Sequence, residues 1–530
     1  MLSTALSLTD PPVGALPAFR RGVRLPAALL VAAVAGGLLD LSFPEVGWWP
    51  LAFVSIALAL WVMIGRSIGG AFVVGAAFGA AFYFTHLVWV GTYLGPIPWV
   101  ALAGLETVLF GVGAIPLALA YRWTDRARGH ATLWLVGVPL LIAGLWSVRE
   151  LVMGSWPYSG FPWARIGMTQ ANGLLPEAAS WVGVTGLSFL IVAACASLVQ
   201  WWRAGGFQRL RGVLPGAAIM ALLVVTPQFP TGDAGWMDIG WVQGNGPSGY
   251  FDDRTPGDLL AAQTTATEPL LGQDMDLLVW PEGAVDSDPL ANPATALHLT
   301  DLVDRAGAPL LANAATARDG DVFNTSMLWE GQRAPQLHDK VNPVPFGEYV
   351  PDRWLYERIV PDLIDLIQRE YTAGQNPPFV TVDGVQVGLA ICFDVIYDSV
   401  IWDGARQGAQ VYIFQTNNAD FRGTDENLQQ LAFARMRAIE TGRAVVNIST
   451  VGTSQVIAPD GQTIDGAEAN QTAAAITSVP LREGFTPAVV LGGALTTVIA
   501  LGAITGFAMA GISHQHFHSS PRSVRGETDA

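Results

Sequence analysis

The sequence predicts a protein of two parts, a polytopic α-helical membrane domain and a polar α/β domain that lies outside the cytoplasm. Two observations support this prediction. Hydrophobic residues make up 51% of the chain and charged residues only 14%, which departs from the composition of ordinary soluble proteins. The apolar residues also gather in long stretches before and after a polar region at 229–486.

About eight apolar stretches are near the length that an α-helix needs to cross a bilayer. They lie at 25–41, 48–65, 68–91, 99–121, 131–152, 176–201, 211–228 and 487–511. The first stretch is short and is interrupted by Gly36 and Gly37, and the second follows closely after Pro44. The boundaries of these two spans are therefore the least defined.

The arginines predict the orientation, because cytoplasmic loops carry positive charge. Twelve arginines flank one set of span ends and two, Arg149 and Arg165, belong to the other side. The twelve are Arg20, Arg21, Arg24, Arg66, Arg122, Arg126, Arg128, Arg203, Arg209, Arg211, Arg522 and Arg525. We therefore expect a multi-pass protein of the cytoplasmic (inner) cell membrane. Its parts are a cytoplasmic tail at 1–24, seven spans in 25–228, an extracytoplasmic domain at 229–486, a final span at 487–511 and a cytoplasmic tail at 512–530.

The polar region is strongly acidic. It carries a formal net charge of −21, against +5 for the rest of the chain. A surface of this sign repels nucleic acid and gains nothing from anionic lipid headgroups, so we expect no nucleic-acid partner. We interpret the charge as a solvated outer face.

Within the polar region, short β-rich runs alternate with helical stretches. The runs lie at 237–242, 277–280, 309–312, 387–392, 411–415 and 444–448, and helical patterns occupy 292–307 and 426–441. A hairpin pattern at 453–463 turns at Pro459-Asp460-Gly461. The alternation predicts an α/β sheet covered by helices, with reactive groups at the carboxyl ends of strands.

Three chemically useful residues occupy such strand ends. Glu282 follows the run at 277–280, Cys392 ends the run at 387–392, and Lys340, the only lysine in the chain, follows a strand-like segment at 324–329 and its loop. Each has an ordinary structural explanation alone: a helix cap, a core residue and a surface cation. Their shared placement favours a site. The other cysteine, Cys195, lies in a predicted span, where we expect packing rather than a disulfide.

The three side chains suit one reaction. A thiol attacks a carbonyl only as the thiolate, and a nearby carboxylate can take its proton. The negative charge then moves to the carbonyl oxygen, which an ammonium beside backbone N–H groups can stabilise. Glu282 is thus the candidate base, Cys392 the nucleophile and Lys340 the oxyanion donor. Lysine suits this last role because its compact head differs from the wide fork of arginine.

Three motifs around these residues resemble the Glu-Lys-Cys signature of the carbon-nitrogen hydrolase (nitrilase) superfamily. They are Trp280-Pro281-Glu282, His338-Asp339-Lys340 with the following Val344-Pro345-Phe346-Gly347-Glu348-Tyr349-Val350-Pro351, and Ile391-Cys392-Phe393-Asp394. Seven spans, an outer domain and a final span further resemble the apolipoprotein N-acyltransferases, the membrane-embedded branch of this superfamily. The runs 242–245, 160–163 and 434–443 support the resemblance.

The resemblance implies a four-layer α-β-β-α fold and a two-step reaction. Cys392 would take an acyl chain from a membrane phospholipid as a thioester and pass it to the N-terminal amine of a diacylglyceryl-modified apolipoprotein. Glu348 would orient Lys340. The expected partners are the phospholipid acyl donor, the apolipoprotein acceptor and the lipid bilayer.

This chain departs from the family pattern at two places. Asp394 stands where the family usually has glutamate, which is one methylene longer and so places that contact in question. In the segment 416–421, Asn418 and Asp420 stand where the family commonly has aspartate and tryptophan. The details of the substrate loop are therefore open, and we regard Phe393 and Asn417 as candidate substrate-binding residues.

The segment 351–368 is amphipathic on both sides of Pro361 and includes Trp354 and Leu355. It is either a core helix or a mobile arm that dips into the lipid surface and covers the thiol, and we favour the arm because it follows the Lys340 loop. Trp354 and Leu355 are then candidate substrate contacts.

Other signals are weaker. His514, His516 and His518 could bind a metal, but we expect a disordered tail, no metal and no cofactor. His86 and Glu106 lie within spans and either line a substrate path or pair inside the bundle.

Two rival functions remain. One is a membrane-tethered, nitrilase-like amidase that hydrolyses small extracytoplasmic amides. The other is a transporter or scaffold without chemistry, which the intact set of Glu282, Lys340 and Cys392 argues against.

Overall fold

The computed structural model describes residues 23–125, 130–204 and 206–519. Most of the predicted tails at 1–24 and 512–530 lies outside these residues. So do six of the arginines used for the orientation, namely Arg20, Arg21, Arg126, Arg128, Arg522 and Arg525.

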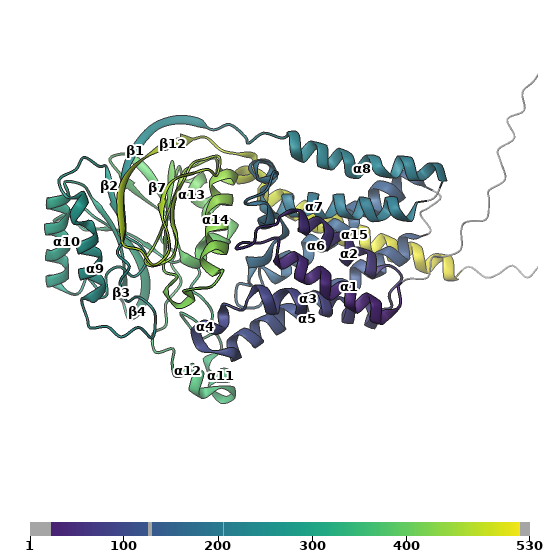
Figure 1. Ribbon diagram of the computed structural model, residues 1–530, viewed down its shortest axis with the longest axis horizontal. Helices are drawn as coiled ribbons and strands as arrows, with labels where there is room; N and C mark the ends of the chain where they lie inside the picture. Colours follow the sequence, from purple (N-terminus) through teal and green to yellow (C-terminus); the bar gives the residue numbers. More distant parts are fainter. Residues whose placement is uncertain (1–22, 126–129, 205, 520–530) are drawn as a thin grey trace, which may run out of the picture.

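A helical bundle forms one end of the molecule (Figure 1). Its helices are α1 (Leu25–Asp40), α2 (Pro50–Met63), α3 (Ile68–His86), α4 (Val90–Leu94), α5 (Pro96–Trp123), α6 (Val138–Met153), α7 (Ala179–Arg203), α8 (Gly206–Val225) and α15 (Pro487–Ser519). A π-helical turn, Leu133–Gly137, precedes α6. Short 3-10 turns at Pro162–Ala164, Ile166–Gln170 and Pro176–Ala178 connect α6 to α7.

Each predicted span coincides with a helix of this bundle. Five are long and apolar enough to cross a membrane: Ile68–His86, Pro96–Trp123, Leu133–Met153, Pro176–Arg203 and Pro487–His516. Three shorter apolar helices lie at Leu25–Asp40, Pro50–Met63 and Arg211–Val225. The chain is therefore a membrane protein with at least five helices of spanning length among its described residues.

Three details differ from the sequence interpretation. Helix α15 continues to Ser519, so the disorder expected from residue 512 onward is wrong up to that residue. The third predicted span, which was expected to reach residue 91, ends as a helix at His86, and the separate helix α4 follows. Arg149, assigned to an outer loop, lies inside α6, where its side chain packs over Phe110 at 4.0 Å.

The α/β domain contains two six-stranded sheets (Figure 1). The first has the order β12 (Ala473–Glu483), β1 (Gly232–Gln243), β2 (Leu277–Val279), β3 (Leu310–Arg318), β4 (Asp321–Trp329) and β5 (Gln336–Asp339). The second has the order β11 (Thr463–Ala467), β10 (Ser454–Ile457), β9 (Val445–Ser449), β8 (Val411–Thr416), β7 (Val385–Ile391) and β6 (Phe379–Val382). The helices of this domain are α9 (Asp258–Thr267), α10 (Pro293–Ala306), α11 (Arg353–Ile359), α12 (Pro361–Ile364), α13 (Asp398–Arg406) and α14 (Glu426–Thr441).

The expectation of one sheet from strand order is wrong. The six predicted strands divide into β1, β2 and β3, which pair in parallel in the first sheet, and β7, β8 and β9, which pair in parallel in the second. Strands β4 and β5 continue the first sheet by antiparallel pairing, so the chain leaves that sheet before β6 begins the second. Alternation along the sequence gave the strands but not which strands pair.

One buried apolar cluster contains residues of both sheets, including Trp241 and Leu311 from the first and Leu389 and Ile413 from the second. Helices α9 and α10 cover the other face of the first sheet, where Leu299 and Leu302 pack against Leu278. The two sheets therefore share one core, and each predicted helix lies where the sequence pattern placed it.

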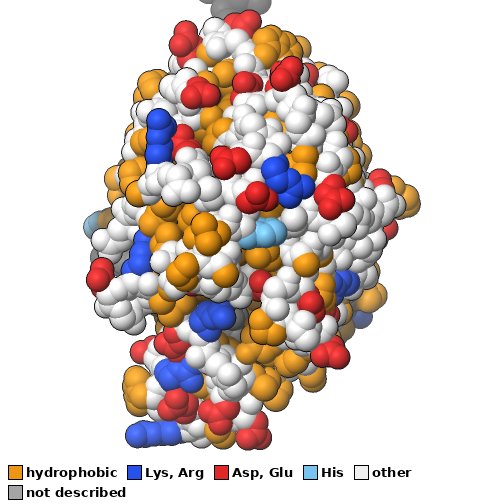
Figure 2. All heavy atoms as spheres, turned by 90° about the vertical axis from the view of Figure 1, so that its left-hand side faces the viewer, with side chains coloured by type: hydrophobic (Ala, Val, Ile, Leu, Met, Phe, Trp, Pro, Cys, Tyr) orange, Lys and Arg blue, Asp and Glu red, His pale blue; other side chains and the backbone are white. Residues whose placement is uncertain are grey.

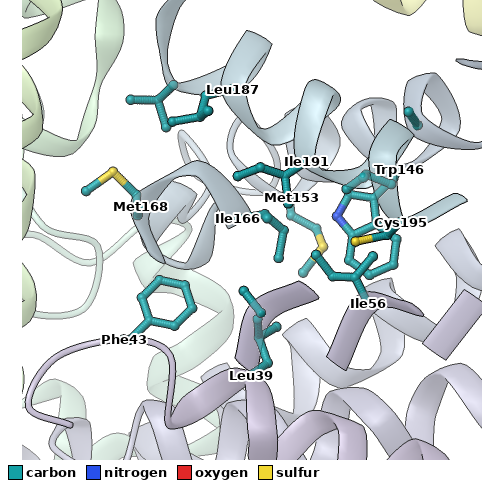
Figure 3. Packing of buried hydrophobic residues seen from close by; sticks show 14 of the residues in the cluster. Leu39, Phe43, Ile56, Trp146, Met153, Ile166, Met168, Leu187, Ile191 and Cys195 are labelled. Atoms are coloured by element: carbon teal, nitrogen blue, oxygen red, sulfur yellow. The ribbon is translucent and has the colours of Figure 1, made fainter. Parts of the chain in front are cut away.

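The α/β domain and the bundle also share a core. A single cluster runs from Leu39, Ile56 and Ile191 of the bundle to Phe414 of β8 and Phe433 of α14. Figure 3 shows part of it, with Leu39, Ile56, Ile166 and Ile191 converging near Cys195. Cys195 is buried in this cluster, as the sequence predicted for a packing residue.

The face of the α/β domain that points away from the bundle carries acidic, basic and hydrophobic side chains among uncharged ones (Figure 2). Acidic side chains are scattered over this face among uncharged ones.

Candidate functional site

Glu282 lies two residues beyond the Trp280 that follows β2, and its side chain is buried. Its Oε1 accepts hydrogen bonds from Asn324 Nδ2 at 2.8 Å and from Lys340 Nζ at 3.4 Å. Its main chain is fixed as well, because Thr450 Oγ1 donates to the Glu282 carbonyl at 2.8 Å. Glu282 is thus held near the carboxyl ends of β2 in the first sheet and β9 in the second.

Lys340 directly follows β5, a strand that the sequence did not predict. Its side chain is only 1% exposed, and Nζ donates to Glu348 Oε1 at 2.8 Å as well as to Glu282. The second oxygen of Glu348 accepts from the Val344 N–H at 2.7 Å, which closes the loop after Lys340. A buried ammonium between two carboxylates is a positioned cation rather than a surface charge.

Cys392 follows the last residue of β7 and starts the 3-10 helix η7 (Cys392–Ile396). Its φ is +49°, a left-handed conformation that is uncommon for a residue with a side chain. Such strain is stored where the surrounding structure requires it. The turn places the thiol beside the Glu282 carboxyl, with which it interacts.

A polar relay from α14 also reaches the thiol. Gln430 Nε2 donates to Cys392 Sγ at 3.4 Å, and Asn418 Nδ2 donates to Gln430 Oε1 at 2.9 Å and to Glu426 Oε2 at 2.7 Å. Asn418 belongs to the second departure from the family pattern, where the family commonly has aspartate. In this chain its amide lies close to the site through Gln430. The sequence analysis missed Gln430 and Glu426, which look like ordinary polar residues of an amphipathic helix.

Asp394 joins the cysteine turn to the lysine loop. Its carboxylate accepts from the N–H groups of Val341 at 3.0 Å and Asn342 at 2.8 Å and from Asn342 Nδ2 at 2.9 Å. The aspartate therefore makes a full set of contacts. These hydrogen bonds connect the shorter side chain to the Asn342 loop.

Burial and charge shift the pKa values of the cluster. Burial raises the pKa of Glu282, against the opposing effect of Lys340, and burial with the neighbouring Glu282 carboxylate raises the pKa of the Cys392 thiol well above its usual range. Burial alone would lower the pKa of Lys340, but Glu348 and Glu282 raise it well above normal. Burial also raises the pKa of Glu426 to about 8. The resting site therefore holds a neutral thiol and a permanent ammonium.

This arrangement has the parts of nucleophilic acyl transfer. A carboxylate lies beside the thiol to take its proton, and an ammonium lies beside that carboxylate. When the thiol attacks a carbonyl, the ammonium of Lys340 can hold the negative charge that develops on the carbonyl oxygen. Among the described residues, no group of three or more His, Cys, Asp or Glu side chains is arranged to hold a metal ion.

The remaining predicted residues lie in different surroundings. Phe393 is buried and stacks on Phe161 at 6.0 Å between ring centroids, which links the cysteine turn to the loop after α6. Asn417 holds the loop at Ser248, whose Oγ donates to Asn417 Oδ1 at 3.1 Å. Gly283, next to Glu282, lies close to the Asn417 amide.

Trp354 and Leu355 belong to α11, which with α12 forms a short helical pair beside α4 (Figure 1). Trp354 is 62% exposed, whereas Ile364 and Ile367 are buried against Leu94 of α4. The pair is thus attached by one apolar face and open on the other. Of the two polar residues expected inside spans, His86 Nδ1 contacts Asp40 Oδ1 at 3.1 Å, and Glu106 is buried in α5 and interacts electrostatically with Arg149.

Comparison of the sequence with known proteins identifies the family of the chain. Residues 35–197 match the apolipoprotein N-acyltransferase N-terminal domain, and residues 245–483 match the carbon-nitrogen hydrolase domain. A curated apolipoprotein N-acyltransferase of Mycolicibacterium smegmatis is 33% identical over 96% of this chain and 89% of its own length. That of Photobacterium profundum is 27% identical over 88% of this chain and 91% of its own length.

Among solved structures, a CN-hydrolase superfamily protein from Xanthomonas campestris is 20% identical and aligns over 50% of this chain and 96% of its own, with a TM-score of 0.35. The sequence relatives cover both the bundle and the α/β domain. The chain therefore belongs to the apolipoprotein N-acyltransferase family.

Proposed function

We propose that this chain transfers an acyl chain from a membrane phospholipid to the N-terminal amine of a diacylglyceryl-modified apolipoprotein. One observation carries the proposal: the buried cluster of Glu282, Lys340 and Cys392 belongs to an α/β domain whose core is continuous with membrane helices. Relatives named apolipoprotein N-acyltransferases support transfer over hydrolysis of a small amide.

In the first step, Glu282 takes the proton of Cys392 as the thiolate attacks the ester carbonyl of the phospholipid. The ammonium of Lys340 holds the charge on the carbonyl oxygen. The ester C–O bond then breaks, and the departing lysophospholipid oxygen receives the proton from Glu282. The products are a thioester on Cys392 and a free lysophospholipid.

In the second step, the amine of the apolipoprotein attacks the thioester carbonyl, and Glu282 takes a proton from the attacking nitrogen. The C–S bond breaks, and the cysteine sulfur recovers that proton. The product is an amide and the enzyme returns to its starting state. Because Glu282 gives back each proton that it takes, one buried carboxyl group serves both steps.

Other groups would support this chemistry without taking part in it. Glu348 orients Lys340, and Asp394 keeps the lysine loop on the cysteine turn, as their hydrogen bonds suggest. Phe393 and Asn417 would border the substrates. Trp354 and Leu355 would contact lipid from the open face of the α11–α12 pair, which acts as a mobile arm.

The proposed setting is the cytoplasmic cell membrane. Eight spans arise if the helices Leu25–Asp40, Pro50–Met63 and Arg211–Val225 cross together with the five longer ones. Both termini then lie in the cytoplasm. Residues 229–486 form a four-layer α-β-β-α domain outside it, between the seventh span and the final span at 487–511. The shared core of the two sheets and the cover of α9 and α10 support the layered arrangement.

Mass spectrometry of the intact protein tests the first step. The full chain is incubated in nanodiscs with phospholipid and no acceptor. We expect an added acyl mass on the peptide that contains Cys392, and none in a Cys392→Ala variant. A protein that turns over phospholipid without any such adduct would contradict the thioester route, and release of free fatty acid would favour the hydrolase.

A further inference from the structure

A cavity of about 410 Å³ lies behind the cysteine turn, where the α/β domain meets the bundle. Its walls come from α6, α7, α13 and α15 and from the loop before α7, and α13 packs against α15 here (Figure 1). Ile396 and Tyr397 form the wall on the side of the catalytic domain. Glu282, Lys340 and Cys392 do not line it, so the cavity is separate from the candidate active site.

Three residues that line the cavity are deeply buried and have a polar atom without a partner. Glu150 and Arg165 are 7% exposed and Trp402 is 6% exposed. Within the described part of the chain, Glu150 Oε2, Arg165 Nε and Trp402 Nε1 make no hydrogen bond. Unpaired buried polar atoms are costly, so two donors and one acceptor at one cavity indicate a polar ligand.

One wall of the cavity reaches the exposed side of α15, where Gly493 lies. Gly493 lines the cavity, and a Cβ built on it would meet no atom within 4 Å. It shares an exposed helical stripe with Val490, 53% exposed, and Leu501, 60% exposed. A molecule in the cavity can therefore extend an apolar tail along α15 into the bilayer.

The charges of the lining are balanced. Two carboxylates, Glu150 and Asp398, and two guanidinium groups, Arg165 and Arg406, line the cavity. Arg165 already binds Asp398 at 2.8 Å and Arg406 contacts Asp403 at 3.1 Å, so the cavity offers no excess of either sign. A ligand that carries both a phosphodiester and an ammonium fits this lining better than an anion alone.

We propose that this cavity binds the headgroup of a zwitterionic bilayer phospholipid that is not a reactant. The phosphodiester oxygens accept hydrogen bonds from Arg165 Nε and Trp402 Nε1, the ammonium donates to Glu150 Oε2, and the acyl chains lie along the exposed stripe of α15. This site is distinct from the one at which the acyl donor meets Cys392.

The bound lipid would act on the cysteine turn through its wall. Arg165 donates to the Ile396 carbonyl at 3.1 Å, and Arg437 donates to the same carbonyl at 3.0 Å and to that of Val395 at 2.9 Å. Ile396 is the last residue of η7, which begins at Cys392. An occupant that fixes Arg165 therefore stabilises the turn that carries the nucleophile, and it does so from the membrane side.

Native mass spectrometry of the full chain tests the site. A Cys392→Ala background prevents acylation. Gly493→Leu adds a large side chain at the lining of the cavity, and Gly502→Leu is the matched control, because it adds the same side chain to open space on the same helix but outside the lining. After delipidation and titration with phosphatidylethanolamine, we expect the background and Gly502→Leu proteins to retain one more lipid than Gly493→Leu. Trp402→Phe, which keeps the ring and loses the donor, should weaken retention about tenfold.

The competing ligands decide the chemistry. Diacylglycerol lacks the phosphodiester and should not occupy the site; equal retention of diacylglycerol would refute a headgroup site. Soluble glycerophosphoethanolamine has the headgroup but no acyl chains and should displace the lipid poorly. Displacement at equal concentration would show that the site binds a soluble headgroup compound rather than a bilayer lipid. Equal lipid counts in Gly493→Leu and Gly502→Leu would overturn the proposal, as would unaltered retention in Trp402→Phe.

Discussion

The molecule contains two buried clusters of charge that differ in balance. The candidate active site sets one ammonium, Lys340, against the carboxylates of Glu282 and Glu348 and the thiol of Cys392. The second cluster, at the junction with the bundle, sets Arg165 and Arg437 against Asp398 and Glu440. We call the second one the junction cluster.

The balance decides which groups can change their protonation. In the active site, burial and excess negative charge raise the pKa values of Glu282 and Cys392, so a proton can pass between them. In the junction cluster, burial would raise the pKa of Asp398, but Arg165 and Arg437 lower it to about 2. Burial also raises the pKa of Glu440, against the opposing effect of Arg437. The first cluster therefore holds a nucleophile beside a base, whereas in the second the carboxylate of Asp398 stays charged between two guanidinium groups.

The comparison is tested most strongly by exchanging the cations. Lys340→Arg keeps the charge but widens the head, and we expect kcat to fall about 10²-fold to 10³-fold because an oxyanion donor is displaced. Arg437→Lys in the junction cluster should instead lower the melting temperature and change kcat much less than Lys340→Arg does. Acyl-transfer kinetics and thermal unfolding in detergent measure both; near-normal activity of Lys340→Arg would show that charge alone is needed.

Removing a charge from the junction cluster should destabilise the protein. Asp398→Asn leaves Arg165 and Arg437 without their shared carboxylate, at a cost of about 3–5 kcal/mol. Because the pKa of Asp398 is lower in the folded protein, its contribution is complete above the pKa of an unfolded aspartate and is lost as the pH falls toward about 2. Unfolding of Asp398→Asn that matches the parent at pH 7 would show that this cluster is not stabilising.

The protonation of the active site can be followed by alkylation of Cys392. Alkylation needs the carboxylate form of Glu282, and burial raises the pKa of Glu282. The rate of iodoacetamide labelling should therefore rise with pH, with a midpoint at a higher pH than the pKa of an ordinary glutamate. Glu282→Gln should remove this rise and lower the neutral rate. A midpoint at the usual glutamate value would contradict the role of burial at this site.

The smallest effect is expected from the relay on α14. Gln430→Leu removes the donor to Cys392 Sγ and should lower kcat about tenfold or less. Gln429→Leu is the matched neighbour, because Gln429 accepts from Trp163 Nε1 at 2.7 Å and, among the described residues, Gln430 rather than Gln429 donates to the thiol. Equal kinetic losses in the two variants would mean that Gln430 acts only through packing.

The two clusters also differ in how far the sequence predicts them. Glu282, Lys340 and Cys392 follow strand-like runs and carry family motifs, so their meeting could be predicted. Asn324 and Gln430 could not, since one is a strand residue and the other a helix residue with no local signal. The junction cluster was also missed, because Arg165, Asp398 and Arg437 are far apart in sequence and each looks like a surface charge.

The fold shows the same limit. Apolar stretches predicted the bundle helices other than α4, and helical periodicity placed α10 and α14 closely, because both signals are local. Strand pairing depends on residues far apart in the sequence, so strand patterns alone could not predict the division into two sheets or the edge strand β5. The resemblance to a family implied two β layers, and the structure has two sheets.

A chase of the acyl-enzyme tests the central claim most directly. Protein carrying an isotopically labelled acyl chain on Cys392 is freed of phospholipid and mixed with a diacylglyceryl-cysteine peptide, and intact mass spectrometry follows both species. We predict that the label leaves Cys392 and appears as an amide on the peptide, while a peptide with an acetylated N-terminus leaves the acyl-enzyme unchanged. Label that remains on Cys392, or that appears only as free fatty acid, would contradict transfer through this cysteine.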